Sequence, residues 1–95
     1  MGEVKKNNLV GLFLRNKPAF ILMKIYSCKS HCYASRIAKD VDCTYSHTVR
    51  IIQIFEKSGL LIFEKTGRTK TIQLTKKGRK IAENLNRLIS SIRND

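Results

Sequence analysis

Residues 34–59 read ASRIAKDVDCTYSHTVRIIQIFEKSG and contain two runs of apolar residues at helical spacing. The first run gives a short helix one apolar face, formed by Ala34, Ile37, Ala38 and Val41. The second run predicts a longer helix that directs three side chains toward a core: Thr48, Ile52 and Phe55. Two such helices joined by a tight turn form a helix-turn-helix.

The boundaries of these helices carry the residue types that helix ends favour. Asp42 tolerates the left-handed backbone conformation that a sharp helix-ending turn often needs. Thr44 is placed to cap the second helix, because its hydroxyl can accept a hydrogen bond from the backbone N–H of Ser46 or His47. Gly59 is predicted to end that helix, since glycine is preferred just beyond a helix C-terminus.

The residues before the motif supply one further core helix. Pro18 suits the first turn of a helix, where a missing backbone N–H costs nothing. Residues 19–26 are apolar nearly all round except for Lys24, which fits a buried helix. The preceding residues 1–17 carry apolar side chains around Gly11, and both a strand and a short helix remain open for them.

Beyond the motif, the apolar period changes from helical to alternating, which predicts a β-hairpin. Its strands span 60–65 and 69–75 around a glycine-containing turn at 66–68. Thr75 is then placed to cap a last helix that runs to the C-terminus. The order predicts an α+β, mainly α fold: a winged helix-turn-helix with a three-helix core, a two-stranded β wing and a long C-terminal helix.

The composition describes one small and strongly basic domain. The 95 residues carry 19 Lys and Arg against 7 Asp and Glu, a formal net charge of +12, and 42% of them are hydrophobic. Such a charge attracts polyanions, of which nucleic acid and anionic membrane surfaces are the common ones. No apolar run reaches the roughly 18–20 residues of a membrane-spanning helix, and no signal peptide is evident. We therefore expect a cytoplasmic protein without a membrane partner.

A narrow apolar stripe on the last helix predicts a homodimer. Its members recur at spacings of four, three and four, as in a coiled coil: Ile81, Leu85, Leu88 and Ile92. Each Leu or Ile side chain that stays exposed loses the stabilisation of about 1.5–3 kcal/mol that its burial would contribute. We expect a two-fold dimer that buries this stripe together with three residues of the N-terminal segment: Leu9, Leu12 and Phe13. The chain then divides into an N-terminal segment with a candidate dimer contact (1–17), the winged core (18–75) and a dimerisation helix (76–95).

Four short stretches follow one another in a recognisable order. They are Ile37-Ala38-Lys39, Tyr45-Ser46-His47-Thr48-Val49, Phe55-Glu56-Lys57-Ser58-Gly59-Leu60 and Leu74-Thr75-Lys76-Lys77-Gly78. Together they resemble the winged-helix regulators of the MarR-like type, especially small archaeal and archaeal-virus forms, over roughly residues 18–85. The resemblance implies a dimeric DNA-binding transcription factor. Asp42 stands where glycine is common in that family, and both terminal segments are shorter than in full-length members, so no small-molecule effector is implied.

The second helix of the motif carries the candidate base-reading residues. In a helix-turn-helix, the N-terminal half of this helix enters the major groove. Arg and Gln can read guanine and adenine edges, and Val can meet a thymine methyl group. The predicted recognition residues are Thr44, Tyr45, Ser46, His47, Val49, Arg50 and Gln53. His47 fits either a phosphate contact or a stacking position against the core.

Two further groups of residues are candidates for contacts with the DNA backbone. The hairpin turn is narrow enough for Arg68 to approach a minor groove. The predicted wing contacts are Lys65, Thr66, Gly67, Arg68, Thr69 and Lys70. The predicted phosphate contacts on and before the first helix of the motif are Tyr33, Ser35, Arg36 and Lys39, although Tyr33 fits a core position equally well.

The cysteines and carboxylates do not form a recognisable chemical site. Cys28 and Cys32 flank three residues that include His31, a spacing that matches no structural zinc site, and Cys43 is distant. Buried free thiols are common, and cytosolic disulfides are rare outside hyperthermophiles. The seven carboxylates are scattered and no Gly-rich phosphate loop occurs. We expect no metal, no cofactor and no enzymatic activity.

The sequence therefore predicts a homodimeric winged-helix protein that binds double-stranded DNA with sequence specificity and regulates transcription. The main alternative is an architectural, chromatin-like protein with the same fold and little sequence preference. A further alternative is a metal-sensing or redox-sensing regulator switched through Cys28, Cys32 and Cys43.

Overall fold

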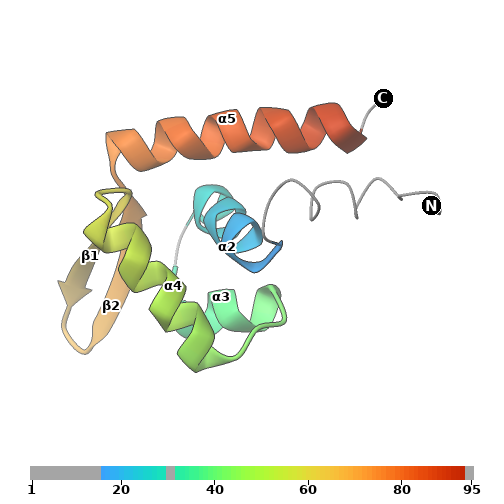
Figure 1. The fold of residues 1–95 in the computed structure, drawn as a ribbon. Helices are drawn as coiled ribbons and strands as arrows, with labels where there is room; N and C mark the ends of the chain where they lie inside the picture. The colour runs from blue at the N-terminus through green and yellow to red at the C-terminus, as the bar shows by residue number, and fades with distance from the viewer. Residues whose placement is uncertain (1–15, 30–31, 94–95) are drawn as a thin grey trace.

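Four helices and a two-stranded antiparallel sheet make up the part of the chain that the structure, a computed structural model, describes: residues 16–29 and 32–93 (Figure 1). The elements are α2 (Asn16–Ser27), α3 (Ala34–Asp40), α4 (Tyr45–Lys57), β1 (Leu61–Thr66), β2 (Thr69–Leu74) and α5 (Lys76–Arg93). The predicted mainly helical α+β fold, a winged helix-turn-helix, is confirmed. The helix predicted from Pro18 begins two residues earlier, so Pro18 lies in its first turn.

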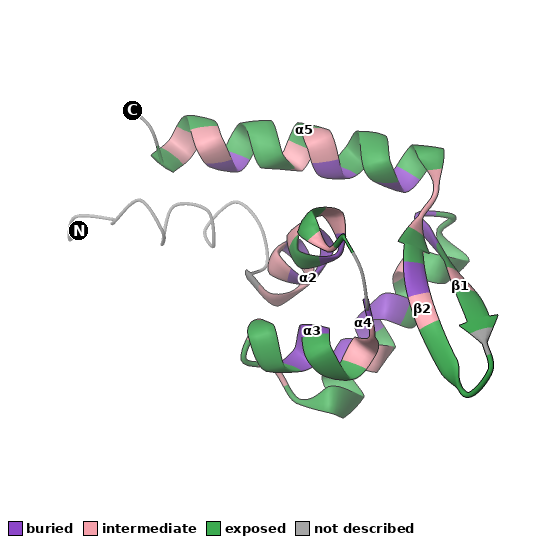
Figure 2. Ribbon diagram, turned by 180° about the vertical axis from the view of Figure 1, so that it is seen from behind, coloured by how far each residue is buried: buried purple, intermediate pink, exposed green. Residues whose placement is uncertain are grey.

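One apolar core joins these elements. The core takes at least one buried residue from each of α2, α3, α4, β1 and β2, among them Ile21, Ile37, Ile52, Leu61 and Ile72. Burying each such side chain contributes about 1.5–3 kcal/mol. Figure 2 shows the buried residues on the facing sides of α2, α3 and α4, and on the side of α5 that faces α2. The core therefore holds the helix-turn-helix and the wing as one unit.

The turn between α3 and α4 has the predicted geometry. Asp42 has φ 54°, in the left-handed region. The backbone N–H of His47 donates to Thr44 Oγ1 at 3.2 Å, which is the predicted N-cap of α4. The Lys17 ammonium adds a contact that the sequence did not reveal: it donates to the carbonyls of Val41 at 2.9 Å and Asp42 at 2.7 Å. The first turn of α2 thereby holds the turn of the motif in place.

Three boundaries of the wing differ from the predicted hairpin by one residue each: Leu60 precedes β1, Thr66 belongs to it, and Thr75 follows β2. Its register pairs Leu61 with Leu74 at one end and Thr66 with Thr69 at the other. Thr66 therefore belongs to β1 rather than to the turn, which consists of Gly67 and Arg68. Gly67 has φ 63°, a conformation that favours glycine in a two-residue hairpin turn.

The first turn of α5 is fastened to the end of α4. Thr75 Oγ1 donates to the Gly59 carbonyl at 2.6 Å and accepts from the backbone N–H of Gly78 at 3.0 Å, as predicted for an N-cap. Gly78 lies directly against Leu60: a Cβ on Gly78 would be 1.8 Å from the Leu60 carbonyl oxygen. Only glycine allows α5 to begin so close to this backbone.

The rest of α5 packs on α2 through a line of residues that the sequence pattern did not identify. Ala82 and Ile89 are buried on this side. The predicted dimer stripe lies partly beside that line: Ile81 and Leu88 remain 38% and 44% exposed, and Leu85 and Ile92 are half-buried. The other predicted dimer residues, Leu9, Leu12 and Phe13, lie outside the described residues.

Candidate nucleic-acid interface

The start of α4 presents a polar surface on the side opposite the core. Thr48, Ile51 and Ile52 face inward and are buried. The predicted recognition residues on the other side are exposed, except for the half-buried Val49: Thr44, Tyr45, Ser46, His47, Arg50 and Gln53. The structure therefore brings this predicted set together on one accessible helix face.

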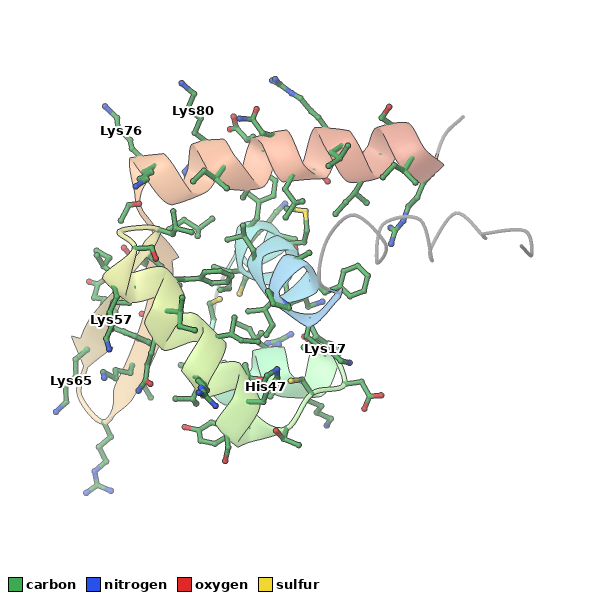
Figure 3. The ribbon with its side chains drawn as sticks, viewed as in Figure 1. Lys17, His47, Lys57, Lys65, Lys76 and Lys80 are labelled. Carbon is green, nitrogen blue, oxygen red and sulfur yellow. The ribbon has the colours of Figure 1, made fainter. Side chains whose placement is uncertain are left out.

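His47 and Lys57 also lie on the exposed surface of α4. His47 is exposed at the beginning of α4, so its ring is not part of the core (Figure 3). Lys57 is exposed on the last turn of α4 and continues the spacing of Ser46, Arg50 and Gln53 at intervals of four, three and four. Lys57 was not among the residues predicted from the sequence, although the same helical periodicity applied over the whole of α4 would have identified it.

The wing concentrates positive charge at its tip. Lys65 and Lys70 lie directly opposite each other in the register, and Arg68 is exposed in the turn beyond them. The Lys70 ammonium lies 4.6 Å from the centroid of the Phe63 ring, a cation–π contact. Like charges that face each other across a hairpin destabilise it. A polyanion at the tip would relieve that repulsion. Gly67 and Thr69 are exposed there, and the side chain of Thr66 is not described.

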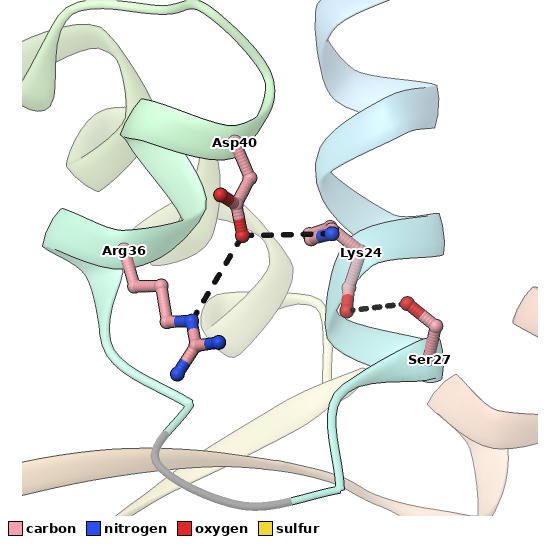
Figure 4. A network of polar contacts seen from close by, with 4 residues as sticks. All are labelled: Lys24, Ser27, Arg36 and Asp40. Carbon is pink, nitrogen blue, oxygen red and sulfur yellow. Dashed lines mark hydrogen bonds and ion pairs between the residues drawn. The ribbon is translucent and has the colours of Figure 1, made fainter.

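The outer face of α3 carries the predicted phosphate contacts. Ser35, Arg36 and Lys39 are exposed, whereas Tyr33 is half-buried just before the helix. Arg36 Nε lies 4.0 Å from Asp40 Oδ2, and Lys24 Nζ lies 3.5 Å from the same oxygen. Figure 4 shows both ion pairs converging on Asp40. Exposed ion pairs of this kind contribute about 0–1 kcal/mol, so Arg36 can exchange its partner for a phosphate at little cost.

The folded chain places the start of α4 and the tip of the wing at the same edge, away from α5 (Figure 1). Residues 65–80 form a basic run with seven Lys and Arg and no acidic residue, but the folded chain does not keep these cations together. Figure 3 shows Lys65 on the wing, whereas Lys76 and Lys80 project from α5 at the opposite edge. The chain turns at Thr75, between the two groups, which separates the cations into two surfaces.

Cys28 and Cys32 are the remaining chemically distinctive groups. Neither forms a disulfide, and burial raises the pKa of Cys32 to about 12, an effect that a hydrogen bond with the Cys28 side chain reinforces. Cys32 therefore stays protonated near neutral pH. Within 16–29 and 32–93, no group of three His, Cys, Asp or Glu side chains could hold a metal ion.

Among the helices of residues 16–29 and 32–93, none combines the length and the apolar character that crossing a bilayer requires.

The comparisons with known proteins agree with this fold. No model of a known protein family matches the sequence. An uncharacterized protein of Archaeoglobus fulgidus is 36% identical over 89 residues, which cover 90% of this chain and 94% of that protein. The crystal structure of AF1382 from the same organism superposes with a TM-score of 0.82 at 35% identity, over 92% of this chain and 99% of that one.

A bacterial structure shows the wider relationship. The MarR family transcriptional regulator SPO1453 from Silicibacter pomeroyi has a TM-score of 0.76 at 22% identity, over 93% of this chain and 63% of that one. This likeness confirms the MarR-like winged-helix fold that the sequence motifs indicated. The chain therefore belongs to the family of the archaeal protein AF1382, and its fold is the winged helix-turn-helix of the MarR-like type.

Proposed function

We propose that this protein is a homodimeric transcription regulator that binds double-stranded DNA in the cytoplasm with sequence specificity. The observation that supports this most directly is the shared edge of the start of α4 and the wing tip (Figure 1). A recognition helix in the major groove and a basic hairpin beside it are a common docking arrangement of winged helices. Phosphates neutralised by the cations supply most of the affinity, and α4 supplies the sequence preference.

The apolar stripe of α5 supports the dimer. The exposure of Ile81 and Leu88 leaves apolar area that a second copy can cover. A two-fold axis at this stripe would hold two recognition helices at a fixed separation, and successive major grooves about 34 Å apart are the expected targets. The DNA site expected for such a dimer is a palindrome.

The wing contributes sequence-independent affinity. Replacing Arg68 with Ala should weaken binding to specific and random duplexes by the same factor and reduce the slope of log K against log salt by about 1 for each chain in contact. Titration of both duplexes at several salt concentrations measures this. An unchanged slope would remove Arg68 from the set of DNA contacts.

The exposed face of α4 contributes sequence preference. Arg50→Ala or Gln53→Ala should cost about 1–3 kcal/mol on the specific site for each lost base contact, and much less on random DNA. The ratio of specific to random affinity should therefore fall by about tenfold to a hundredfold. Equal losses on both duplexes would contradict the base-reading role.

The proposed function is tested by selecting DNA sequences from a random pool and measuring affinity for the selected and random duplexes at two salt concentrations. Preference for a palindromic site by about a thousandfold or more is expected for a specific regulator. Steep salt dependence without preference would support the architectural alternative instead.

A further inference from the structure

The outward side of α5 carries a line of cations that the proposed interface does not use. Lys76, Lys80 and Arg87 are exposed, and their spacings of four and seven place them along one side of the helix. We call these three residues the outer basic line. Figure 3 shows that Lys76 and Lys80 point away from the rest of the domain, on the edge opposite His47 and Lys65. The line therefore cannot touch a duplex that is bound to α4 and the wing of the same chain.

The fold does not explain these charges. Within the described ranges, no ion pair involves any residue of the outer basic line. Glu83 is the one acidic residue among the 18 of α5, and the first turn of that helix contains no acidic residue. A cation at the start of a helix opposes the helix dipole, so the charge of Lys76 does not stabilise α5. A polyanionic ligand would neutralise these unpaired charges.

The geometry of the line fits an extended polyanion. Arg87 lies eleven positions beyond Lys76, so the three cations extend over about 16 Å at 1.5 Å per residue. A DNA strand carries one phosphate for about every 3.4 Å of helix axis, so a row of this length faces several phosphates. A single small anion could contact Lys76 and Lys80 together but could not also reach Arg87.

The proposed dimer leaves this line accessible. Ile81 and Leu88 each follow a member of the line by one residue and are therefore turned by about 100° around the helix. Packing of the apolar stripe against a second copy thus covers a neighbouring side of α5. Each dimer would present its two recognition helices to one duplex and two outer basic lines elsewhere.

We propose that the outer basic line binds the phosphate backbone of a second DNA duplex, so that the protein bridges two duplexes. Once the first duplex is bound, neighbouring DNA is present at high local concentration, which makes even a weak second contact effective. This inference rests on the proposed function for the first contact. An acidic protein segment is the other class of ligand with matching charge, and the test below separates the two.

The test loads the full chain onto an immobilised duplex and then adds a labelled duplex of random sequence. The label stays on the surface after washing only if the protein bridges the two duplexes. The amount of the Lys76→Ala/Lys80→Ala variant that loads onto the first duplex should be within about twofold of the wild-type amount. The amount of labelled second duplex that this variant retains should be at least tenfold lower than with the wild type. The matched control, Lys29→Ala/Arg79→Ala, removes the same charge from exposed residues outside the line and should retain both. Unchanged melting temperatures would show that both variants are folded.

The outcomes are distinct. Retention of the second duplex by the Lys76→Ala/Lys80→Ala variant, or equal losses in both variants, would overturn the proposal while leaving the first contact intact. Failure of the wild type to load onto the first duplex would instead overturn the proposed function, together with the inference that rests on it. Polyglutamate retained by the wild type in place of the second duplex would assign the line to an acidic protein partner and overturn the bridging proposal.

Discussion

Replacing Gly78 with Ala is expected to destabilise the protein by at least about 3 kcal/mol, the upper end of the usual overpacking penalty. The new Cβ would be 1.8 Å from the Leu60 carbonyl oxygen and 2.7 Å from its carbon. Both atoms are backbone, so they cannot move aside as a flexible side chain would. Helix α5 must shift, which also breaks the hydrogen bonds of Thr75 to Gly59 and Gly78.

Both the sign and the size of the stability change in Gly78→Ala distinguish the close contact with Leu60 from the effect of helix propensity. Glycine is worse than alanine in a helix interior by about 1 kcal/mol, so propensity alone predicts that Gly78→Ala stabilises the protein. Since small domains are stable by only about 5–15 kcal/mol, a loss of about 3 kcal/mol should lower the urea midpoint strongly. Far-ultraviolet circular dichroism during urea denaturation measures the change.

Gly67→Ala is the matched control. A Cβ on Gly67 would meet no atom of the described residues beyond its chain neighbours within 4 Å, but Gly67 has φ +63°. The substitution should therefore cost about 1–2 kcal/mol, from backbone strain alone. If Gly78→Ala were as mild as Gly67→Ala, or stabilising, α5 could not begin as close to Leu60 as the structure places it.

The fold could be predicted because its signals are local. Asp42, Thr44, Gly59 and Thr75 each act within a few residues of a helix boundary, and all four have the expected conformation or hydrogen bond. The alternating pattern of the wing likewise depends on adjacent residues. The error at Thr66 is of one residue, because the residues at the hairpin turn permit both a three-residue and a two-residue connection.

The features that could not be predicted depend on contacts between distant segments. Lys17 reaches the carbonyl of Val41 across 24 residues, and a lysine in a first turn gives no sign of this. The approach of Gly78 to Leu60 and the burial of Ala82 and Ile89 against α2 likewise follow from how α5 docks. The division of the basic run into two surfaces has the same origin. Which of the predicted side chains contact DNA stays a prediction.

Leu88→Glu is expected to convert the proposed homodimer into a monomer. Leu88 is 44% exposed on α5, so a charged side chain there should hardly disturb the fold of one chain. In a two-fold interface the carboxylates of both copies would be buried near the axis without partners, which is strongly unfavourable. Light scattering of the purified protein measures the mass. Ile62→Glu is the matched control, because Ile62 is 52% exposed on β1, outside the stripe, and should leave the dimer unchanged.

Loss of the dimer should also be the largest single effect on DNA binding. A dimer on a palindrome gains avidity, because binding of one recognition helix holds the second near its half-site. The Leu88→Glu variant should therefore bind the full palindrome about 10²–10⁴ times more weakly than the wild type. Its affinity for an isolated half-site should change little, because α4 and the wing are intact. A dimeric Leu88→Glu protein with full affinity would place the dimer contact elsewhere than on the stripe of α5.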